Sequence, residues 1–543
     1  MLQLPAPSLL AIDGSATADS IEVVLVLLIA ATALAIVARR IGIPYPILLV
    51  IGGLAIGFVP GLPAVDLEPD VVFLLFLPPI LFAAGYFTSI RDLRAKAGKI
   101  TSLAVGLVLF TTVAVAVVVH ALVPGIGWAP AFALGAIVAP PDAVAATAVF
   151  QRLGVPRPIV TTLEGESLLN DATALIVYRF AVIAATTGLF SIVDAGGAFV
   201  AAAVGGLAIG VAVGAAVAWL VRRTDDPVFS TIITFVAPIA AYLPAEAVGF
   251  SGVLSTVVAG IYLGQHSRAL GSEVRVAATA AWQVLLFIVN GAIFILIGLQ
   301  LPRVLANLGD RPAGELFGIA AAVIATVIVT RIVWVYASIY ATWFMVGRRR
   351  GGDHPSFRRI SLLAWAGMRG VVSLAAALAL PPLPDGSPFP ERDLIVFLAF
   401  AVILATLVGQ GLTLPPLIRT FELAETGLDG HEEAHVRVVT SEAAAARIDE
   451  LAEEWPGHLE LIDNLRAQVQ HRTRHAEQHH EDSETSGDMA AEQELLEHRA
   501  IRIAVIDAER TALVQLRERG AVSDQVFRRV ERDLDLDELR LEA

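Results

Sequence analysis

The sequence contains no cysteine among its 543 residues. Without thiols the chain cannot form a disulfide, a thiolate metal site or a thiol redox centre. Charged side chains are scarce as well: they make up 17% of the chain, whereas about 25% is typical of a soluble domain. The alternating segments of about ten residues that mark a β-barrel are absent too. These absences leave a helical membrane protein as the class that fits the composition.

Long apolar runs take the place of the missing charge. Hydrophobic residues form 56% of the chain, and apolar runs of about 20 residues, the length of a helix that crosses a bilayer, recur between short polar loops. We therefore predict an all-α membrane protein in a lipid bilayer. It has about 13 transmembrane helices, centred near Leu28, Ile51, Leu77, Leu109, Ile137, Ile176, Val211, Pro238, Val257, Ile293, Ile324, Val372 and Ala401.

Basic residues predict the orientation of these spans. The loops after spans 1, 3, 5, 7, 9 and 11 hold 17 Lys and Arg residues, whereas the intervening loops hold three, namely Arg303, Arg311 and Arg392. Because cytoplasmic loops are enriched in Lys and Arg, we expect the N-terminus to lie outside and the C-terminal tail to lie in the cytoplasm. The expected location is the plasma (inner) membrane.

The acidity of the chain belongs to its C-terminal tail. From Phe421 onward there are 30 acidic and 14 basic residues, so that the first 420 residues are close to neutral. We predict a transmembrane domain over 1–420 and a small helical cytoplasmic domain over 421–543, with a flexible linker at Gln478–Asp488. Charge confined to a tail is no argument for nucleic-acid binding, and we expect no nucleic-acid partner. The predicted helices of the C-terminal tail are Arg447–Trp455, Glu492–Arg519 and Ser523–Leu541.

Histidines recur at helical spacing in this tail. His471, His475 and His479 lie four residues apart, and His480 follows directly. Such a run can bind a metal ion or sense pH, but it is more often a solvated helix face. We keep both interpretations open.

Two predicted spans are interrupted. Span 5 contains Ala-Pro-Pro-Asp at 139–142, and span 12 contains Gly-Met-Arg-Gly at 367–370. Consecutive prolines prevent a regular helix, and broken helices survive at membrane depth only where protein or a wet cavity surrounds them. The breaks lie seven spans apart, the spacing expected if spans 1–6 and 8–13 are inverted repeats whose broken helices cross at a transporter's binding site. No residue-level repeat is evident, so this symmetry rests on topology alone.

Ionisable residues inside spans are costly, and each is a candidate for function. Asp142 lies at the first break and Asp171 on the next span; carboxylates together with carbonyl and hydroxyl oxygens suit a hard monovalent cation. Burial disfavours the charged form of a carboxylate, so we expect Asp171 to hold a proton near neutral pH and to release it when a cation binds. One exchangeable charge predicts electroneutral exchange. The interior set is Asp142, Glu164, Glu166, Asp171, Arg179, Arg331 and Arg369.

The remaining charged groups have simpler interpretations. We pair Glu166 with Arg331 as a structural ion pair, and we expect Arg369 to offset helix-end charges and the field of Asp142. Asp142 itself has an alternative role as the N-cap of the second half-helix. We expect Glu164 to face cytoplasmic water. Ser167 is either a cation ligand or a hydroxyl that faces its own helix. Arg179 is either a minor member of an ion pair or a side chain that extends to the membrane surface.

The stretch from Gly135 to Asp171, which ends in Glu-Gly-Glu-Ser-Leu-Leu-Asn-Asp, resembles the signature of a known family. Together with Leu77–Phe82 and Gly367–Ser373 it is similar to the electroneutral monovalent cation:proton antiporters, the bacterial sodium/proton exchangers, over roughly Ile21–Thr420. The resemblance implies a 13-span fold, a homodimer and an elevator-like movement of a six-helix core. It also implies a secondary active transporter for pH and sodium homeostasis, not an enzyme, with no cofactor.

The resemblance assigns roles by position. Asp142 and Asp171 match the acids that bind the cation (Na⁺) and exchange the proton, Asn170 matches the Asn beside the second acid, and Ser167 aligns with a site hydroxyl. Glu166 and Arg331 match a structural ion pair, and Arg369 matches the arginine of the second broken helix. The usual Thr-Asp-Pro is Pro141-Asp142-Ala143 here, which leaves only the Pro141 carbonyl to coordinate, and Ala83 replaces an acid often found in span 3; both departures bear on the choice of Na⁺, K⁺ or Li⁺.

Two other functions remain open at this stage. A gated cation channel lined by the same acids would need a continuous polar path, whereas these acids cluster at one depth. A sensor led by the tail would lose its role when the tail is deleted, whereas an antiporter would keep transporting. The tail matches no nucleotide-binding or potassium-regulatory module.

Overall fold

The computed structural model is built of helices. It describes residues 14–59, 72–188, 192–224, 226–266, 271–309, 311–347, 354–423, 428–482, 489–519 and 521–542, and within these ranges all regular structure is helical. The chain divides into two compact units, Met1–Ala424 and Glu425–Ala543.

The first unit contains the membrane-spanning helices. Each of the predicted span centres falls inside a helix, and the prediction of an all-helical, multi-pass membrane protein is confirmed for the described residues. Shorter apolar helices are Tyr45–Gly57, Val72–Phe87 and Gly252–Gln265. Eight helices are long and apolar enough to cross a membrane: Ala97–Leu122, Trp128–Phe150, Arg157–Thr187, Gly196–Arg222, Pro227–Ala247, Ser272–Ala306, Ala313–Met345 and Arg392–Thr420.

Helices of the first unit pack into two groups. The first, which we call the flanking bundle, is held by close approach at glycines: a Cβ added at Gly260 would overlap the carbonyl of Phe82, and one at Gly298 would overlap that of Val50. Small residues let helices approach closely in a membrane. The flanking bundle consists of α1 (Gly14–Ile41), α2 (Tyr45–Gly57), η1 (Val72–Phe76), α4 (Leu77–Phe87), α11 (Ile192–Arg222), α12 (Pro227–Ala247), α13 (Gly252–Gln265), α14 (Ser272–Leu299) and α15 (Leu301–Ala306).

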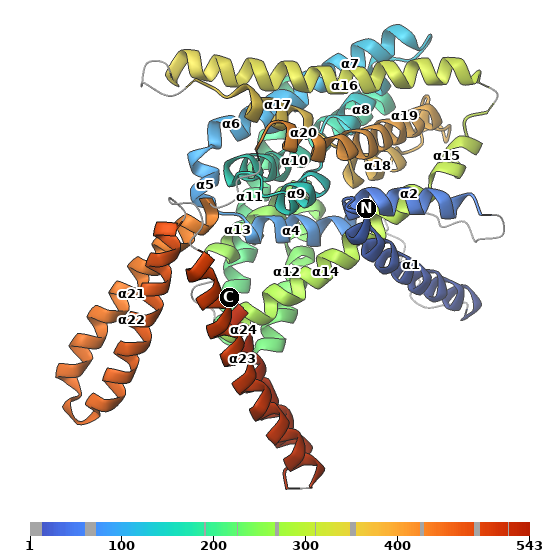
Figure 1. Cartoon of the computed structure of the whole chain (residues 1–543). Coiled ribbons are helices and arrows are strands. Elements are labelled where there is room, and N and C mark those ends of the chain that lie inside the picture. The colour runs from blue at the N-terminus through green and yellow to red at the C-terminus, as the bar shows by residue number, and fades with distance from the viewer. Residues whose placement is uncertain are drawn as a thin grey trace. The chain divides into compact units, whose positions relative to one another are not determined.

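The second group, which we call the broken-helix bundle, holds both interrupted spans. In Figure 1 its long helix α16 lies along α7, and these two helices are in contact. Its members are α5 (Ile90–Ala95), α6 (Ala97–Thr101), η2 (Ser102–Leu107), α7 (Val108–Leu122), α8 (Trp128–Val138), α9 (Ala143–Arg152), α10 (Arg157–Thr187), α16 (Ala313–Thr342), η4 (Trp343–Gly347), α17 (Phe357–Trp365), α18 (Val371–Leu378), α19 (Arg392–Leu404), η6 (Ala405–Gln410) and α20 (Gly411–Thr420).

Contacts between the two bundles are mainly apolar. Leu168 and Ala172 of α10 share one buried cluster with Leu81 of α4 and Val257 of α13. A polar bridge also crosses this boundary, because Arg179 of α10 forms an ion pair with Glu246 of α12. Arg179 is thus an ion-pair member. Apolar surfaces can slide over one another with little loss of specific bonding, as in shear motions of packed helices.

The second unit contains two helical hairpins. The helix α21 (Leu428–Glu454) contacts α22 (Leu459–Asp482), and α23 (Met489–Glu518) contacts α24 (Asp524–Glu542). Helix α22 was not predicted, and the predicted linker at Gln478–Asp488 is wrong for its first five residues, which belong to α22. Residues 483–488 and the side chains of His471, His475, His479 and His480 lie outside the described part of the chain.

Candidate cation site at the two broken helices

The first break separates α8 from α9. Helix α8 ends at Val138 and α9 begins at Ala143, because two consecutive prolines lie between them and cannot continue a helix. Asp142 caps the new helix: its Oδ1 accepts a hydrogen bond from the backbone N–H of Val144 at 2.8 Å. The carboxylate is therefore held at the positive end of α9, which favours its charged form.

The second break meets the first. Helix α17 ends at Trp365 and α18 begins at Val371, and the backbone N–H of Asp142 donates to the carbonyl of Met368 at 2.7 Å. Gly370 lies so close that a Cβ on it would overlap the Asp142 carboxylate. A glycine at this position lets the two breaks touch.

Arg369 donates hydrogen bonds to the carbonyl groups at the C-terminal end of α8. Its side chain is fully buried; its Nε donates to the carbonyl of Val138 at 3.0 Å and its Nη2 to that of Ala139 at 3.3 Å. It also donates to the carbonyl of Gly367. These carbonyls would otherwise be unpaired at the negative end of a helix, so the guanidinium compensates both hydrogen bonding and charge.

Helix α10 supplies the polar groups that face the first break. The Nδ2 of Asn170 donates to the carbonyl of Pro141 at 2.9 Å, and Ser167 Oγ accepts from the backbone N–H of Ala143 at 3.4 Å. Asp171 is buried next to them, and its carboxylate interacts electrostatically with that of Asp142. The structure thus brings Asp142, Asp171 and three oxygen-bearing neighbours into one place.

A buried ion pair connects the helices around this site. Arg331 of α16 donates from Nη1 to Oε1 of Glu166 at 2.6 Å and from Nη2 to Oε2 at 3.1 Å, and neither side chain is exposed. Its Nη2 also donates to the carbonyl of Leu363 at 3.2 Å. The pair joins α10, α16 and α17, and Gly367 leaves room for it because a Cβ there would overlap the Arg331 side chain. Such a bidentate arrangement fixes geometry as well as charge.

Glu164 lies apart from these contacts. It is half-buried and precedes Asp171 by seven residues on α10, about two helical turns along the same face. The structure therefore places it on α10 between the start of that helix and Asp171, not among the groups at the breaks.

In the part of the chain that the structure describes, several buried polar oxygen atoms near the breaks have no partner, and of their residues only Asn170 was identified from the sequence. Within the described residues, the hydroxyls of Thr147 and Ser373 and the amide oxygens of Asn170 and Gln410 are buried without a hydrogen-bond partner. Unpaired buried oxygens are rare because they lose their water without replacement. The signal in the sequence is weak, since single hydroxyls and amides in apolar helices are common. The described residues contain no cluster of three or more His, Asp or Glu side chains that could hold a resident metal ion.

Two helices that break at the same place, with buried acids beside the breaks, are typical of the binding region of a secondary transporter. Comparison with known families agrees with this class. Residues 24–420 match the family model described as "Sodium/hydrogen exchanger, transmembrane". The chain belongs to the sodium/hydrogen exchanger family, as the resemblance of its motifs implied.

Individual relatives match between about three quarters and nearly all of the chain. An uncharacterised Na⁺/H⁺ exchanger of Mycobacterium tuberculosis is 34% identical over 96% of this chain and 97% of its own. The sodium, potassium, lithium and rubidium/H⁺ antiporter of Bacillus subtilis is 36% identical over 74% of this chain and 61% of its own. The solved sodium proton antiporter MjNhaP1 of Methanocaldococcus jannaschii shares the fold, with a TM-score of 0.60 and 21% identity over 75% of this chain and 99% of its own.

Proposed function

We propose that this protein is a secondary active transporter that exchanges a monovalent cation for a proton across the plasma membrane. Na⁺ is the first candidate for the cation, with K⁺ and Li⁺ as alternatives. The observation that carries the proposal is the placement of Asp142 and Asp171 beside the contact between the two broken segments, with Asn170 and Ser167 holding the first break. The role that follows for the cell is pH and sodium homeostasis.

Competition between a proton and a cation for one pair of carboxylates accounts for the exchange. The start of α9 favours the charged form of Asp142 through the hydrogen bond from Val144, whereas Asp171 is buried and close to Asp142. Two neighbouring carboxylates resist simultaneous ionisation. In the proposed cycle Asp171 therefore carries the proton in the cation-free site, and a cation that binds between the two acids displaces it.

The stoichiometry follows from the charges around the site. Glu166 and Arg331 neutralise each other, and Arg369 is occupied by the carbonyls of α8. Only Asp171 then changes its charge during the cycle. One proton for one monovalent cation makes the exchange electroneutral, with Pro141, Asn170 and Ser167 as further cation-binding oxygens. Pro141 contributes its backbone carbonyl. The hydrogen bond from Asn170 uses one lone pair of this oxygen, and the second lone pair is available to a cation.

We further propose that the broken-helix bundle moves as a body against the flanking bundle. Its helices correspond to predicted spans 4–6 and 11–13, which are equivalent positions in two inverted repeats of a fold with about 13 spans. The apolar contact between the bundles supports an elevator-like movement of this kind. The proposal includes a homodimer, an external N-terminus and a cytoplasmic tail over 421–543 that follows the transmembrane domain over 1–420.

Exchange in proteoliposomes tests the function. The purified chain is reconstituted with an acidic interior and a pH-sensitive dye, and Na⁺, Li⁺ or K⁺ is added outside. We expect at least one ion to dissipate the pH gradient at a rate that does not depend on an imposed membrane potential. Asp171→Asn should abolish the response, whereas Asp393→Asn, the same chemical change at a half-exposed acid on α19, should leave it intact.

Each contrary result has a separate meaning. If Asp171→Asn exchanges as fast as the wild type, the site assignment is wrong. If cation flux proceeds without proton flux, the protein is a channel. If none of the three ions is exchanged, the proposed function is rejected.

A further inference from the structure

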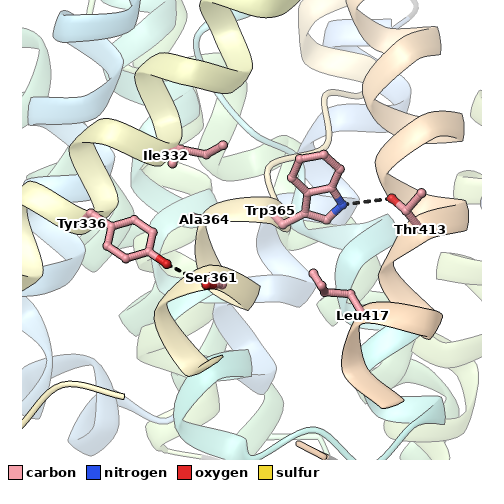
Figure 2. A pocket seen from close by; sticks show the side chains of 7 residues that line it. All are labelled: Ile332, Tyr336, Ser361, Ala364, Trp365, Thr413 and Leu417. Atoms are coloured by element: carbon pink, nitrogen blue, oxygen red, sulfur yellow. Dashed lines mark hydrogen bonds between the residues drawn. The ribbon is translucent and has the colours of Figure 1, made fainter. Parts of the chain in front are cut away.

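An open groove lies on the broken-helix bundle, away from the two acids. It encloses about 300 Å³ between α16, α17 and α20, and Figure 2 shows its side chains arranged around the opening. The lining residues are Ile332, Tyr336, Ser361, Ala364, Trp365, Thr413 and Leu417.

The polar atoms of the groove are bonded to each other. The hydroxyls of Tyr336 and Ser361 are 2.6 Å apart, and Trp365 Nε1 donates to Thr413 Oγ1 at 2.9 Å (Figure 2). The remaining lining is aliphatic or aromatic carbon. An occupant therefore finds no polar group in need of a partner, and the groove suits an apolar chain.

The lining of the groove extends along α17 from Trp365, beside the second break, toward the start of that helix. Its inner end is formed by Trp365, the last residue of α17 before the second break, and by Ile332, which follows the ion-paired Arg331. Arg358, Ser361 and Trp365 lie on one face of α17 because they are spaced by three and four residues. From Arg358 to Trp365 this face extends about 10 Å.

Aromatic rings and basic groups surround the outer end. The ring of Phe357 lies 5.9 Å from that of Tyr336 and 6.5 Å from that of Phe421. Aromatic residues collect where a membrane meets water. Arg358 donates to the carbonyl of Phe421 at 3.1 Å and to Glu422 at 3.0 Å, and Arg359 beside it is exposed. The mouth of the groove is thus interfacial and basic.

We propose that this groove binds an anionic phospholipid, with one acyl chain between α16, α17 and α20 and the phosphate on Arg358. The ion pair of Arg358 with Glu422 is 55% and 78% exposed on its two sides, and such a pair is weak. A lipid phosphate offers a stronger, bidentate partner for the guanidinium. The mouth lies on the predicted cytoplasmic side, where anionic lipids and basic residues attract each other.

Lipid binding to the purified full-length protein tests the headgroup site. Native mass spectrometry and thermal unfolding in detergent compare phosphatidylglycerol with phosphatidylcholine of the same acyl chains. We expect the wild type to prefer phosphatidylglycerol and Arg358→Gln to weaken its binding roughly fivefold. Glu422→Gln should strengthen it, because the competing carboxylate is gone. Arg40→Gln, an exposed arginine at the end of α1 in the other bundle, is the control and should change nothing.

A filled groove tests the acyl-chain site. Ala364→Leu places a larger side chain among the lining residues and should remove the bound lipid, while size-exclusion chromatography reports whether the variant folds. If this variant does not fold, the proposal is tested by the two headgroup variants alone, because Arg358→Gln should weaken lipid binding and Glu422→Gln should strengthen it.

Four results would overturn the proposal. They are equal binding of the two lipids by the wild type, equal losses in Arg358→Gln and Arg40→Gln, lipid retained by a folded Ala364→Leu variant, and a change of oligomeric state in that variant, which would seat a second copy of the chain in the groove.

Discussion

Asp142 combines two roles that substitutions can separate. It caps α9 through Val144 and carries one of the two proposed exchanging charges. Asn caps helices as well as Asp does, whereas Ala does not. We expect Asp142→Asn to keep the thermal stability of the wild type but to lose exchange in proteoliposomes, and Asp142→Ala to lose exchange and about 1 kcal/mol of stability. Exchange at the wild-type rate by Asp142→Asn would reduce the residue to a cap.

The pair of Glu166 and Arg331 is predicted to support structure. Glu166→Gln leaves a fully buried guanidinium without its counter-charge, at a cost of roughly 3–5 kcal/mol. Thermal unfolding in detergent should therefore shift strongly downward, whereas Glu391→Gln, in the half-exposed pair with Arg311, should cost at most about 1 kcal/mol.

A double variant separates charge from packing at this pair. Because two apolar residues leave no unpaired charge, Glu166→Leu with Arg331→Met should recover much of the lost stability. A Glu166→Gln variant as stable as the wild type would show that the pair contributes nothing to the fold.

At the scale of single residues the sequence could indicate which residues matter, but it left most of their contacts undetermined. Asp142, Asp171 and Arg369 stand out because charge is expensive inside an apolar span. The bond from Asn170 to the Pro141 carbonyl depends on how α10 is rotated against the break, and no spacing in the chain determines that rotation. The carbonyl partners of Arg369 were foreseen only as helix-end charge, for the same reason.

The contact between the two broken elements depends on Gly370. An added methyl group would overlap the Asp142 carboxylate and push the two breaks apart. We expect Gly370→Ala to lower the exchange rate at least about tenfold, since misplacing reacting groups by about 1 Å can cost a hundredfold in rate. Gly409→Ala is a matched control, because a Cβ at Gly409 meets no atom within 4 Å. Equal rates for both variants would mean that the close approach is unimportant.

Helices were predictable where composition alone determines them. Apolar runs of span length gave the membrane helices, and Pro140 and Pro141 gave the first break. Helix α22 (Leu459–Asp482) was missed because its apolar residues are confined to its first half, whereas the half after Val469 is polar except for Ala476. The π-helical turns η1, η2 and η6 were missed as well, because an extra residue in a turn leaves no mark in the apolar pattern.

For the whole molecule, the central question is whether the two bundles move against each other. Covalent links answer it, and the absence of cysteine means that introduced thiols are the only ones present. Arg179→Cys with Glu246→Cys replaces the ion pair that joins the bundles. Arg311→Cys with Glu391→Cys replaces a similar ion pair at the ends of α16 and α19, inside the broken-helix bundle. The two pairs are matched in chemistry and in partial exposure.

If the broken-helix bundle must shift to expose the site on alternate sides of the membrane, a short bifunctional thiol reagent should stop exchange only in the variant that links the two bundles, Arg179→Cys with Glu246→Cys. We expect a loss of at least about tenfold after linking Arg179→Cys to Glu246→Cys, and recovery when a reducible linker is cleaved. The untreated variant is the reference, because the original ion pair is already absent from it. Linking Arg311→Cys to Glu391→Cys should leave the rate unchanged, since both positions then move together. Undiminished exchange in the first linked pair would mean that the bundles remain fixed while the cation and the proton cross.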